Sequence, residues 1–413
     1  MSAGRPAAPR YLTLALLLAA VLMAAVLVDW SHQYWSVAAP QMSAWALLLV
    51  WCAMLVRDKS AGMPMPRVMW ALLGAALWGP AQLALGISVS RFATQEAALA
   101  WASSAAYFWL GVQALGSAEV RERFLSVMLA FCGVMALAAV LQFYTAPDLV
   151  FWLIPSHDCI GPFIYKNHFA AFVELLFPVA VVRILVDRRR ALLWGVVAAT
   201  LFAAVVVSAS RGGVALLAVE LVAVLALGAR RRWIPARRVL LLSLQLPVLF
   251  AVLVGIFGFQ SIWAHFHEAS SADIRKKLLL STVEMIAQRP AQGFGLGTWR
   301  TVYPRYARFD NSRYANEAHN DWAQWAAEGG VPFALLMAAV AIWAAKRAWR
   351  QPWALGPVAV FAHSLIDYPT RDPAVMGLMF VMLGAAAAAT TQRGAGADAV
   401  RMRALLPFSY SGS

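Results

Sequence analysis

The sequence predicts an all-α integral membrane protein of about twelve transmembrane helices with one large loop that contains short amphipathic helices. Apolar residues make up 62% of the chain and charged residues 13%, whereas soluble domains are about 45–50% apolar and 25% charged. The mean hydropathy is +0.66. Several segments exceed the roughly 18 largely uncharged residues that a helix needs to cross a bilayer. We therefore expect a single polytopic membrane domain over residues 1–413.

Twelve segments have the length and composition of membrane-spanning helices. They are residues 11–28, 37–56, 68–89, 97–116, 124–143, 168–186, 191–209, 212–229, 239–258, 331–345, 353–366 and 374–390. The first resembles a signal peptide because Arg5 and Arg10 precede its apolar run. The eleven spans that follow favour an uncleaved anchor.

The basic residues follow the topology rule of membrane proteins and do not indicate a nucleic-acid surface. The net charge is +14, but most Lys and Arg side chains lie in alternate loops, in runs such as Arg188–Arg190 and Arg230–Arg232. Such runs remain on the cytoplasmic side of the bacterial inner membrane, so both termini are expected in the cytoplasm. The short loops expected on the periplasmic side carry few basic residues: Arg91, Lys166, Arg211 and Arg371.

A loop of unusual length separates the ninth and tenth spans, over residues 259–330, and is expected in the periplasm. It is rich in aromatic residues, which argues against disorder. Structureless loops longer than about 15 residues are uncommon in compact domains, so we expect local structure. The spacing predicts an amphipathic helix from Asp273 to Gln288 and a tight turn at Gly293–Gly297. A second helix is expected from Asn316 to Glu328, ended by Gly329–Gly330.

The strongest chemical motif of this loop is Glu317-Ala318-His319-Asn320-Asp321. A histidine beside polar groups can accept a proton from an attacking hydroxyl near neutral pH, with Glu317 and Asn320 as supporting groups. The alternative is structural, with His319 and Asn320 capping the short helix. Glu317, His319 and Asp321 recur every second residue, which scatters them around a helix, so we predict no metal site.

Two further motifs place an arginine where an anion is expected. In Ser208–Gly213, Arg211 stands at the junction of two spans, and paired glycines leave backbone N–H groups open to phosphate oxygens. In Asp273–Lys277, Arg275 has the forked guanidinium that suits bidentate phosphate contacts. The alternatives are that Arg211 bonds helix-end carbonyls and that Arg275 lies on a solvated helix face.

Two more segments place polar residues at the ends of spans. In Gly161–Ala170, Lys166 predicts a nearby anion and Asn167 resembles a helix N-cap. His363 and Asp367 are four residues apart, on one helix face, and are spaced to hydrogen-bond each other. For both segments a purely structural role is the alternative.

Together these segments resemble the O-antigen ligase and polymerase superfamily of bacterial envelope glycosyltransferases. The resemblance covers residues 160–370 and rests on the order and spacing of the motifs. They are Gly161–Ala170, Ser210–Gly213, the Gly293–Gly297 turn with Tyr303-Pro304, Ala318–Asn320 with Glu328–Gly330, and His363 with Asp367. Residues 1–150 contribute no motif to it.

The resemblance implies a glycosyltransferase that uses neither a metal nor another cofactor. Such enzymes transfer a glycan from undecaprenyl diphosphate to an acceptor hydroxyl in the periplasm, and lipid A-core is the expected acceptor. Carried over to this sequence, the family's histidine is His319 and its diphosphate-contacting arginines are Arg211 and Arg275. The outward placement of Lys166 adds this lysine to the expected donor-binding residues. The expected partners are therefore this donor, a glycan acceptor and membrane lipids, without nucleic acid.

Other activities remain open at this point. The same motifs suit a repeat-unit polymerase for O-antigen or exopolysaccharide, or a transferase that glycosylates protein. A transporter or flippase is a further alternative. Such proteins have polar sites near the bilayer midplane and repeated halves, whereas the polar motifs of this sequence lie at span ends and no repeat is visible.

Overall fold

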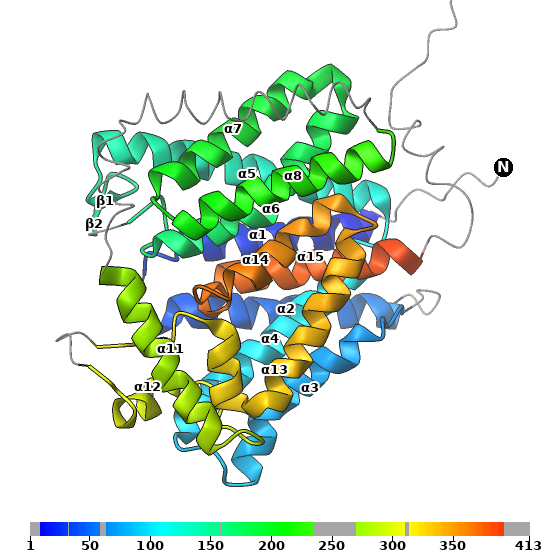
Figure 1. Ribbon diagram of the computed structural model, residues 1–413. Coiled ribbons are helices and arrows are strands. Elements are labelled where there is room, and N and C mark those ends of the chain that lie inside the picture. Colours follow the sequence, from blue (N-terminus) through cyan, green and yellow to red (C-terminus); the bar gives the residue numbers. More distant parts are fainter. Residues whose placement is uncertain are drawn as a thin grey trace, which may run out of the picture.

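The computed structural model of the protein describes residues 9–31, 33–57, 63–156, 159–233, 270–309 and 314–391. These residues form an all-α fold with a small antiparallel hairpin (Figure 1). The longer helices are α1 (Pro9–Leu27), α2 (Tyr34–Arg57), α3 (Val68–Ala84), α4 (Arg91–Ala114), α5 (Ala118–Thr145), α6 (Lys166–Val186), α7 (Ala191–Val207), α8 (Arg211–Arg230), α11 (Ser270–Gln288), α13 (Asp321–Ala348), α14 (Leu355–His363) and α15 (Pro373–Thr391). The short elements are β1 (Leu149–Val150), β2 (Ile154–Pro155), α12 (Trp299–Val302), and the 3-10 helices η1 (Arg188–Arg190), η2 (Tyr303–Arg305), η3 (Pro352–Ala354) and η4 (Pro369–Arg371).

The helices agree in position with the predicted spans. Every predicted span within the described residues overlaps a helix, and the predicted span 239–258 lies outside them. Of the described helices, seven are long and apolar enough to cross a membrane: α1, α2, α5, α6, α7, α8 and α13. α3 and α15 are apolar but shorter. α14 has nine residues and is therefore about 14 Å long, well under the roughly 30 Å hydrocarbon core. The total of twelve spans remains a prediction.

The described helices pack in two groups joined by α1, α14 and α15 (Figure 1). α5, α6, α7 and α8 form one group, and α2, α3, α4 and α13 form the other. α15 packs along α4 and also contacts α6, while α14 contacts α6, α8 and α13. Segments far apart in the sequence thereby meet, and the start of α6 comes close to the loop that follows α14.

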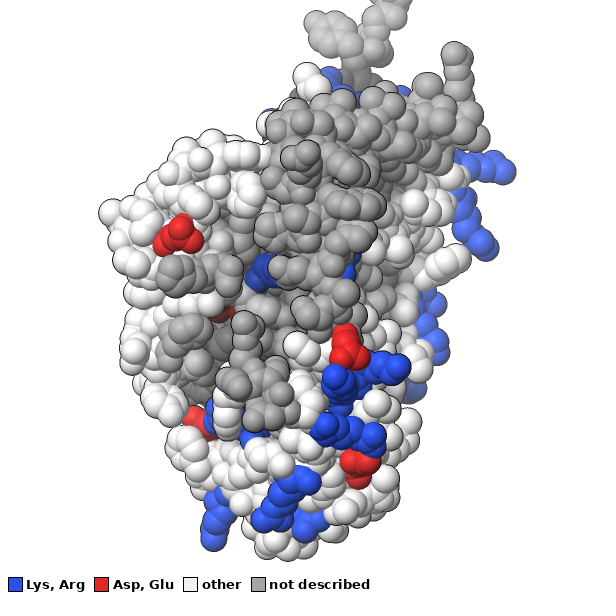
Figure 2. All heavy atoms as spheres, turned by 60° about the vertical axis from the view of Figure 1, so that its left-hand side comes forward, with Lys and Arg blue, Asp and Glu red and all other residues white. Residues whose placement is uncertain are grey.

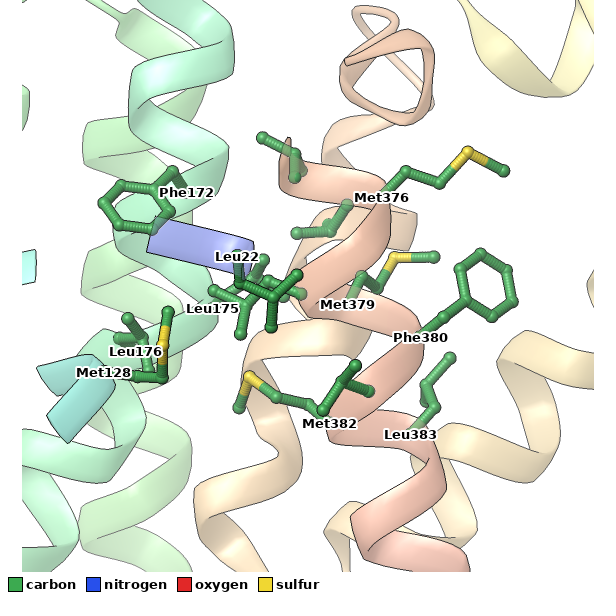
Figure 3. Packing of buried hydrophobic residues seen from close by; sticks show 14 of the residues in the cluster. Leu22, Met128, Phe172, Leu175, Leu176, Met376, Met379, Phe380, Met382 and Leu383 are labelled. Carbon is green, nitrogen blue, oxygen red and sulfur yellow. The ribbon is translucent and has the colours of Figure 1, made fainter. Parts of the chain in front are cut away.

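An apolar core joins the two groups (Figure 3). Leu175 of α6 is fully buried and lies near Met379 and Met382 of α15, and Phe172, also fully buried, lies farther from α15. The flexible thioethers of methionine fill irregular space between helices. Because lipid tails are as apolar as these side chains, close van der Waals packing holds such helices together more than exclusion of water does.

One end of the bundle carries the predicted motifs, and we call it the site end. It is the end at which α2, α4, α6, α8, α13 and α15 begin. Side-chain oxygens cap three of these starts, since Ser90, Ser210 and Asn320 accept hydrogen bonds from the backbone N–H groups of Ala93, Gly213 and Ala323. Each cap satisfies a donor that a helix start otherwise leaves without a partner.

The turn predicted at Gly293–Gly297 is confirmed, and it ties the long loop to the bundle. Its three glycines have φ angles of 66°, 109° and 76°, which glycine adopts without steric cost. The backbone N–H of Phe294 donates to Ala327 at 3.0 Å, and that of Gly295 donates to Glu328 at 2.9 Å. The turn therefore rests against the first part of α13.

The two helices predicted in the long loop are present with shifted starts. α11 begins at Ser270, three residues before the predicted start. α13 begins at Asp321, and the predicted start at Asn316 is wrong, because His319 has a φ of 52° that an α-helix does not tolerate. At Gly330, φ of 78° and ψ of 166° break the helix as expected, and α13 continues beyond this kink.

Candidate active site

The site end gathers polar side chains around the carboxylate of Asp367, in the loop between α14 and η4. This side chain is 1% exposed. Its Oδ2 accepts hydrogen bonds from Tyr165 Oη at 3.0 Å, from Arg275 Nη2 at 3.1 Å and from Asn167 Nδ2. Its Oδ1 accepts from the backbone N–H of Tyr368 at 3.0 Å. A buried carboxylate with so many donors can stay ionised and hold its neighbours in fixed positions.

Asn167 connects the start of α6 with the start of α8. Its Nδ2 donates to Asp367, and its Oδ1 accepts from Ser210 Oγ at 2.7 Å. Ser210 in turn caps α8, the helix that begins with Arg211. The predicted N-cap role of Asn167 is wrong, because Tyr165 is the N-cap of α6 and Asn167 lies inside the first turn. Its side chain does not cap α6 and instead bridges Asp367 and Ser210.

His319 stands beside Asp367 in the segment that precedes α13. Its Nδ1 lies 3.4 Å from Asp367 Oδ1 and 3.4 Å from Tyr165 Oη, and its side chain is 26% exposed. The ring packs edge-on against Tyr368, with 4.9 Å between ring centroids. A carboxylate that faces Nδ1 favours the tautomer protonated there and leaves Nε2 as an acceptor. This geometry suits a base that takes a proton from a bound hydroxyl.

Three cationic side chains lie at the same end of the bundle as this cluster. Arg275 of α11 bonds Asp367 with one nitrogen and the carbonyl of Ile366 with another, at 3.3 Å. Its Nη2 also donates to Tyr165 Oη at 3.5 Å. Lys166 is half-buried at the first residue of α6, and Arg211 is exposed at the first residue of α8. Figure 2 shows Lys and Arg side chains, interspersed with Asp and Glu, on the lower part of the face that this end presents.

The start of α8 lies directly against the segment that carries Asp367. A Cβ atom added at Gly212 would lie 2.5 Å from Ile366 Cδ1 and 3.5 Å from His363 Nε2. A side chain at this position would displace the end of Ile366, so Gly212 leaves the two segments in close contact. The structure thus brings the arginine motif of α8 to the same place as the motif of α6.

Electrostatics keep the charge on Asp367 and the protons on its tyrosine neighbours. Burial opposes ionisation of Asp367, but the hydrogen bond and charge of His319, followed by the charge of Arg275, lower the pKa of Asp367 below its ordinary value. Burial and then the charge of Asp367 raise the pKa of Tyr165 and of Tyr368. Both phenols therefore stay protonated at neutral pH and do not serve as bases.

Glu317 belongs to a neighbouring cluster and does not contact Asp367. Arg371 of η4 lies 2.7 Å from Glu328 Oε2, 3.6 Å from Glu317 Oε2 and 4.0 Å from Asp321 Oδ1. This arginine joins η4 to the first turns of α13. It thereby positions the loop that carries Asp367 relative to the segment before α13.

Asn320 has the structural role that was the alternative for it. Its Oδ1 caps α13 and its Nδ2 donates to the carbonyl of Leu365 at 2.7 Å. His319 makes no such cap, so only Asn320 of these two neighbours caps the helix. Asn320 holds the helix start on the loop after α14, and this leaves the imidazole of His319 directed at Asp367.

The predicted hydrogen bond between His363 and Asp367 is wrong. His363 Nδ1 instead lies 2.8 Å from Glu174 Oε1 of α6, with both side chains buried. α14 ends at His363, so the helical spacing that places residues four apart on one face no longer applies. Glu220 of α8 is also buried, and neither of its carboxyl oxygens has a hydrogen-bond partner among the described residues.

Comparison with protein families tests the resemblance that these motifs suggest. Residues 195–338 match the family model described as O-antigen ligase. The resemblance to the O-antigen ligase and polymerase superfamily is confirmed. The matched segment contains Arg211, Arg275 and His319, whereas Lys166 and Asp367 lie outside it. Comparison with curated proteins finds no match.

The O-antigen ligase match and the apolar helices indicate a membrane protein of glycosyltransferase type, related to ligases and polymerases. Within the described residues, no group of three or more His, Cys, Asp or Glu side chains is arranged to hold a metal ion. That the reaction needs no metal or other cofactor stays a prediction.

Tyr165 and Arg371 are the site residues that sequence reasoning missed. Tyr165 precedes Lys166 in a motif already singled out, yet nothing in the pattern shows that its hydroxyl reaches Asp367. The sequence shows Arg371 only as a basic residue of an outside loop. Its burial against three carboxylates depends on the packing of η4 on α13, which the local sequence does not encode.

Proposed function

We propose that this protein is an inner-membrane glycosyltransferase that moves a glycan from undecaprenyl diphosphate to an acceptor hydroxyl on the periplasmic face, with lipid A-core as the acceptor. One observation carries the proposal: His319 is paired with Asp367 at the end of the bundle where Arg211, Arg275 and Lys166 also lie. A base beside cations suits a reaction in which one substrate loses a proton while the other gains negative charge. The distribution of basic residues supports cytoplasmic termini and a periplasmic site.

The proposed reaction is a displacement at the anomeric carbon of the donor glycan. The proton of the acceptor hydroxyl moves to His319 Nε2 as the hydroxyl oxygen bonds to that carbon. The bond from the carbon to the diphosphate oxygen breaks, and its electron pair stays on the diphosphate. Asp367 holds the tautomer of His319 and stabilises the imidazolium that forms.

The cations act on the leaving group in this mechanism. The diphosphate gains negative charge as it departs, and preorganised donors aimed at that charge lower the barrier. Arg211 at the start of α8 and Arg275 on α11 can offer charge-assisted hydrogen bonds, with Lys166 assisting as a point charge. Arg275 also contacts Asp367 at 3.1 Å, so it links the leaving-group side of the site with the base.

Substitutions in a purified transfer assay with lipid-linked donor test this assignment. We expect His319→Ala to lower turnover about 100-fold or more and Arg211→Ala to lower it about 100-fold. Arg57→Ala is the matched control, because Arg57 is exposed at the far end of α2. Full transfer by both site variants at normal expression would contradict the proposal.

The identity of the acceptor separates the ligase from its relatives. A repeat-unit polymerase or a protein-glycosylating transferase uses the same displacement with another hydroxyl. Glycan chain-length analysis of a deletion strain distinguishes them. Loss of a ligase removes whole chains from the lipid A-core, whereas loss of a polymerase leaves single repeat units.

A further inference from the structure

A second histidine–carboxylate pair lies at the site end, and the proposed reaction does not use it. His168 Nδ1 of α6 is 3.3 Å from Asp372 Oδ2, and the two side chains are 13% and 2% exposed. An ionised carboxylate can only accept, so Nδ1 carries the proton of this contact. The other ring nitrogen, Nε2, is buried and has no hydrogen-bond partner among the described residues. His168 is therefore placed to hold Asp372 and not to take a proton from a substrate.

Asp372 is itself held from two further sides. Its Oδ1 caps α15, because it accepts from the backbone N–H groups of Ala374 at 2.8 Å and Val375 at 2.9 Å. Asp29, in the connection between α1 and α2, hydrogen-bonds the same carboxylate, and burial followed by the charge of Asp372 raises the pKa of Asp29. Burial opposes ionisation of Asp372, but the hydrogen bond and charge of His168 lower the pKa of Asp372 below its ordinary value. Asp29 thus keeps the proton that the two carboxyl groups share, and Asp372 faces His168 as a carboxylate.

Two consecutive residues of α6 hold the two ends of one loop. Asn167 donates to Asp367, at the start of the loop that contains η4, and His168 pairs with Asp372 at its end. The first turn of α6 therefore grips this loop before and after η4. A loop tied at both ends to one helix keeps the side chains that it carries in fixed positions. If the tie to Asp372 is lost, only the bonds to Asp367 itself keep the loop on α6.

A pair of stacked tyrosines connects His168 with the candidate base. The rings of Tyr165 and Tyr368 lie 5.1 Å apart at an angle of 15°. His168 meets both rings edge-on, at 4.9 Å and 5.1 Å between centroids. The hydroxyl of Tyr165 donates to Asp367 at 3.0 Å and lies 3.4 Å from His319 Nδ1. A displacement of His168 is thereby passed to the phenol that contacts both the base and its carboxylate.

We propose that His168 is a positioning residue of the transfer reaction, tied to Asp372 so that the loop after α14 keeps Asp367 against His319. The inference rests on the proposed function and adds a residue to it. His168 acts through Asp372 and the stacked tyrosines and does not touch the reacting atoms. Loss of the tie should lower turnover more than donor binding, because Arg211 stands on α8, which neither partner of the tie belongs to.

Two substitutions of His168 separate the hydrogen bond from the packing of the ring. His168→Asn places an amide nitrogen where Nδ1 stands and can still donate to Asp372, but it has no ring. His168→Phe keeps a ring against the tyrosines and has no donor. In the transfer assay with lipid-linked donor, we expect kcat to fall about tenfold in His168→Phe and to stay within about threefold of the wild type in His168→Asn, with donor KM within about twofold in both. A packing role predicts the opposite order, and any result in which His168→Asn is not the better variant overturns the proposal.

Asp372→Asn tests the other partner of the pair. Asparagine caps a helix as well as aspartate does, so this variant keeps the cap of α15 and loses the charge that faces His168. We expect kcat to fall about tenfold, and no further in the double variant with His168→Phe, because both changes remove one interaction. A loss of about 100-fold in the double variant would mean independent effects and overturn the pairing. Asp187→Asn is the matched control, since Asp187 caps η1 beyond the far end of α6, and it should transfer at the wild-type rate.

Melting temperatures in detergent measure the tie without the reaction. His168→Phe and Asp372→Asn should each melt below the wild type, the double variant should melt no lower than the lower of the two, and His168→Asn should melt closer to the wild type. Additive losses of melting temperature in a wild-type background that transfers glycan overturn the tie and leave the proposed function intact. If the wild type transfers nothing while the losses are non-additive, the proposed function fails, and the role of His168 in it fails too.

Discussion

His319 can act as a base only when its Nε2 is unprotonated and open to substrate. Asp367 and Tyr165 both contact the other ring nitrogen, Nδ1, and a carboxylate there favours the useful tautomer. Tyr165 stays protonated because burial and Asp367 raise its pKa. It therefore fixes the carboxylate and does not compete for the proton of the acceptor.

Asp367→Asn separates the electrostatic role of this carboxylate from its packing. The amide keeps the shape but can donate to Nδ1 of His319, which moves the ring proton to Nε2 and removes the base. We expect turnover to fall about 100-fold or more, with a smaller change in donor binding. Steady-state transfer rates and donor affinities measure the two effects.

Asp273→Asn is the matched control for this substitution. Asp273 is an exposed residue of α11 whose carboxylate pairs with Lys277 four residues along the same helix, and such pairs contribute little. Its variant should transfer at the wild-type rate. Equal rates for the two variants would show that the charge of Asp367 does not serve the reaction.

At the scale of elements, the sequence predicted where helices lie better than which helices touch. Apolar runs locate the spans because length and composition are local properties. Gly293–Gly297 and Gly330 were also predictable, since positive φ angles strongly favour glycine. The partner of His363 was not, because Glu174 lies far away in the chain and the pair forms only where α14 crosses α6.

The same limit applies to the candidate site. His319, Arg211 and Arg275 were singled out by motif, but the centre of the cluster was not. Asp367 was predicted to pair with His363, and it instead collects donors from α6, α11 and the segment before α13. Such a convergence depends on tertiary packing, which a single sequence does not reveal.

Gly330→Ala tests the kink of α13 as an element of the site. Gly330 has φ of 78°, and an added Cβ would lie 2.5 Å from the carbonyl oxygen of Ala291. Strain at such a backbone conformation and overpacking together should cost about 2–4 kcal/mol. We expect a lower melting temperature in detergent and reduced transfer, because the first turns of α13 hold Glu328 against Arg371.

Gly195→Ala in α7 is the comparison for that substitution. A Cβ at Gly195 meets nothing within 4 Å, and alanine is the better helix former by about 1 kcal/mol. This variant should melt at the wild-type temperature or slightly above it. If Gly330→Ala behaves in the same way, the kink is not a constraint on the fold.

At the scale of the whole molecule, the two helix groups meet at a polar junction. α6 and α8 from one group and α13 from the other all begin at the site end, with the loop after α14 between them. The buried charges of this junction affect the stability of the folded protein as well as the proposed reaction. Asp367 joins elements of both groups through its hydrogen bonds, so its ionisation state bears on how firmly the groups are held together.

The pH dependence of stability measures that contribution. The pKa of Asp367 is lowered in the folded protein by His319 and Arg275 against the opposing effect of burial, so folding favours its ionised form. The resulting stabilisation is fully present above the unfolded value of about 3.9 and is lost as the pH falls through the lower folded value. The difference in melting temperature between wild type and Asp367→Asn should therefore still be present at about pH 5 and shrink only below about pH 4. A melting-temperature gap for Asp367→Asn that closes well above pH 5 would show that this carboxylate is not held ionised by its neighbours.

The pKa of Glu317 is shifted in the opposite direction, because burial raises it despite the charge of Arg371. The difference in melting temperature between Glu317→Gln and the wild type should thus be largest at neutral pH and disappear as the pH falls toward the ordinary carboxyl range.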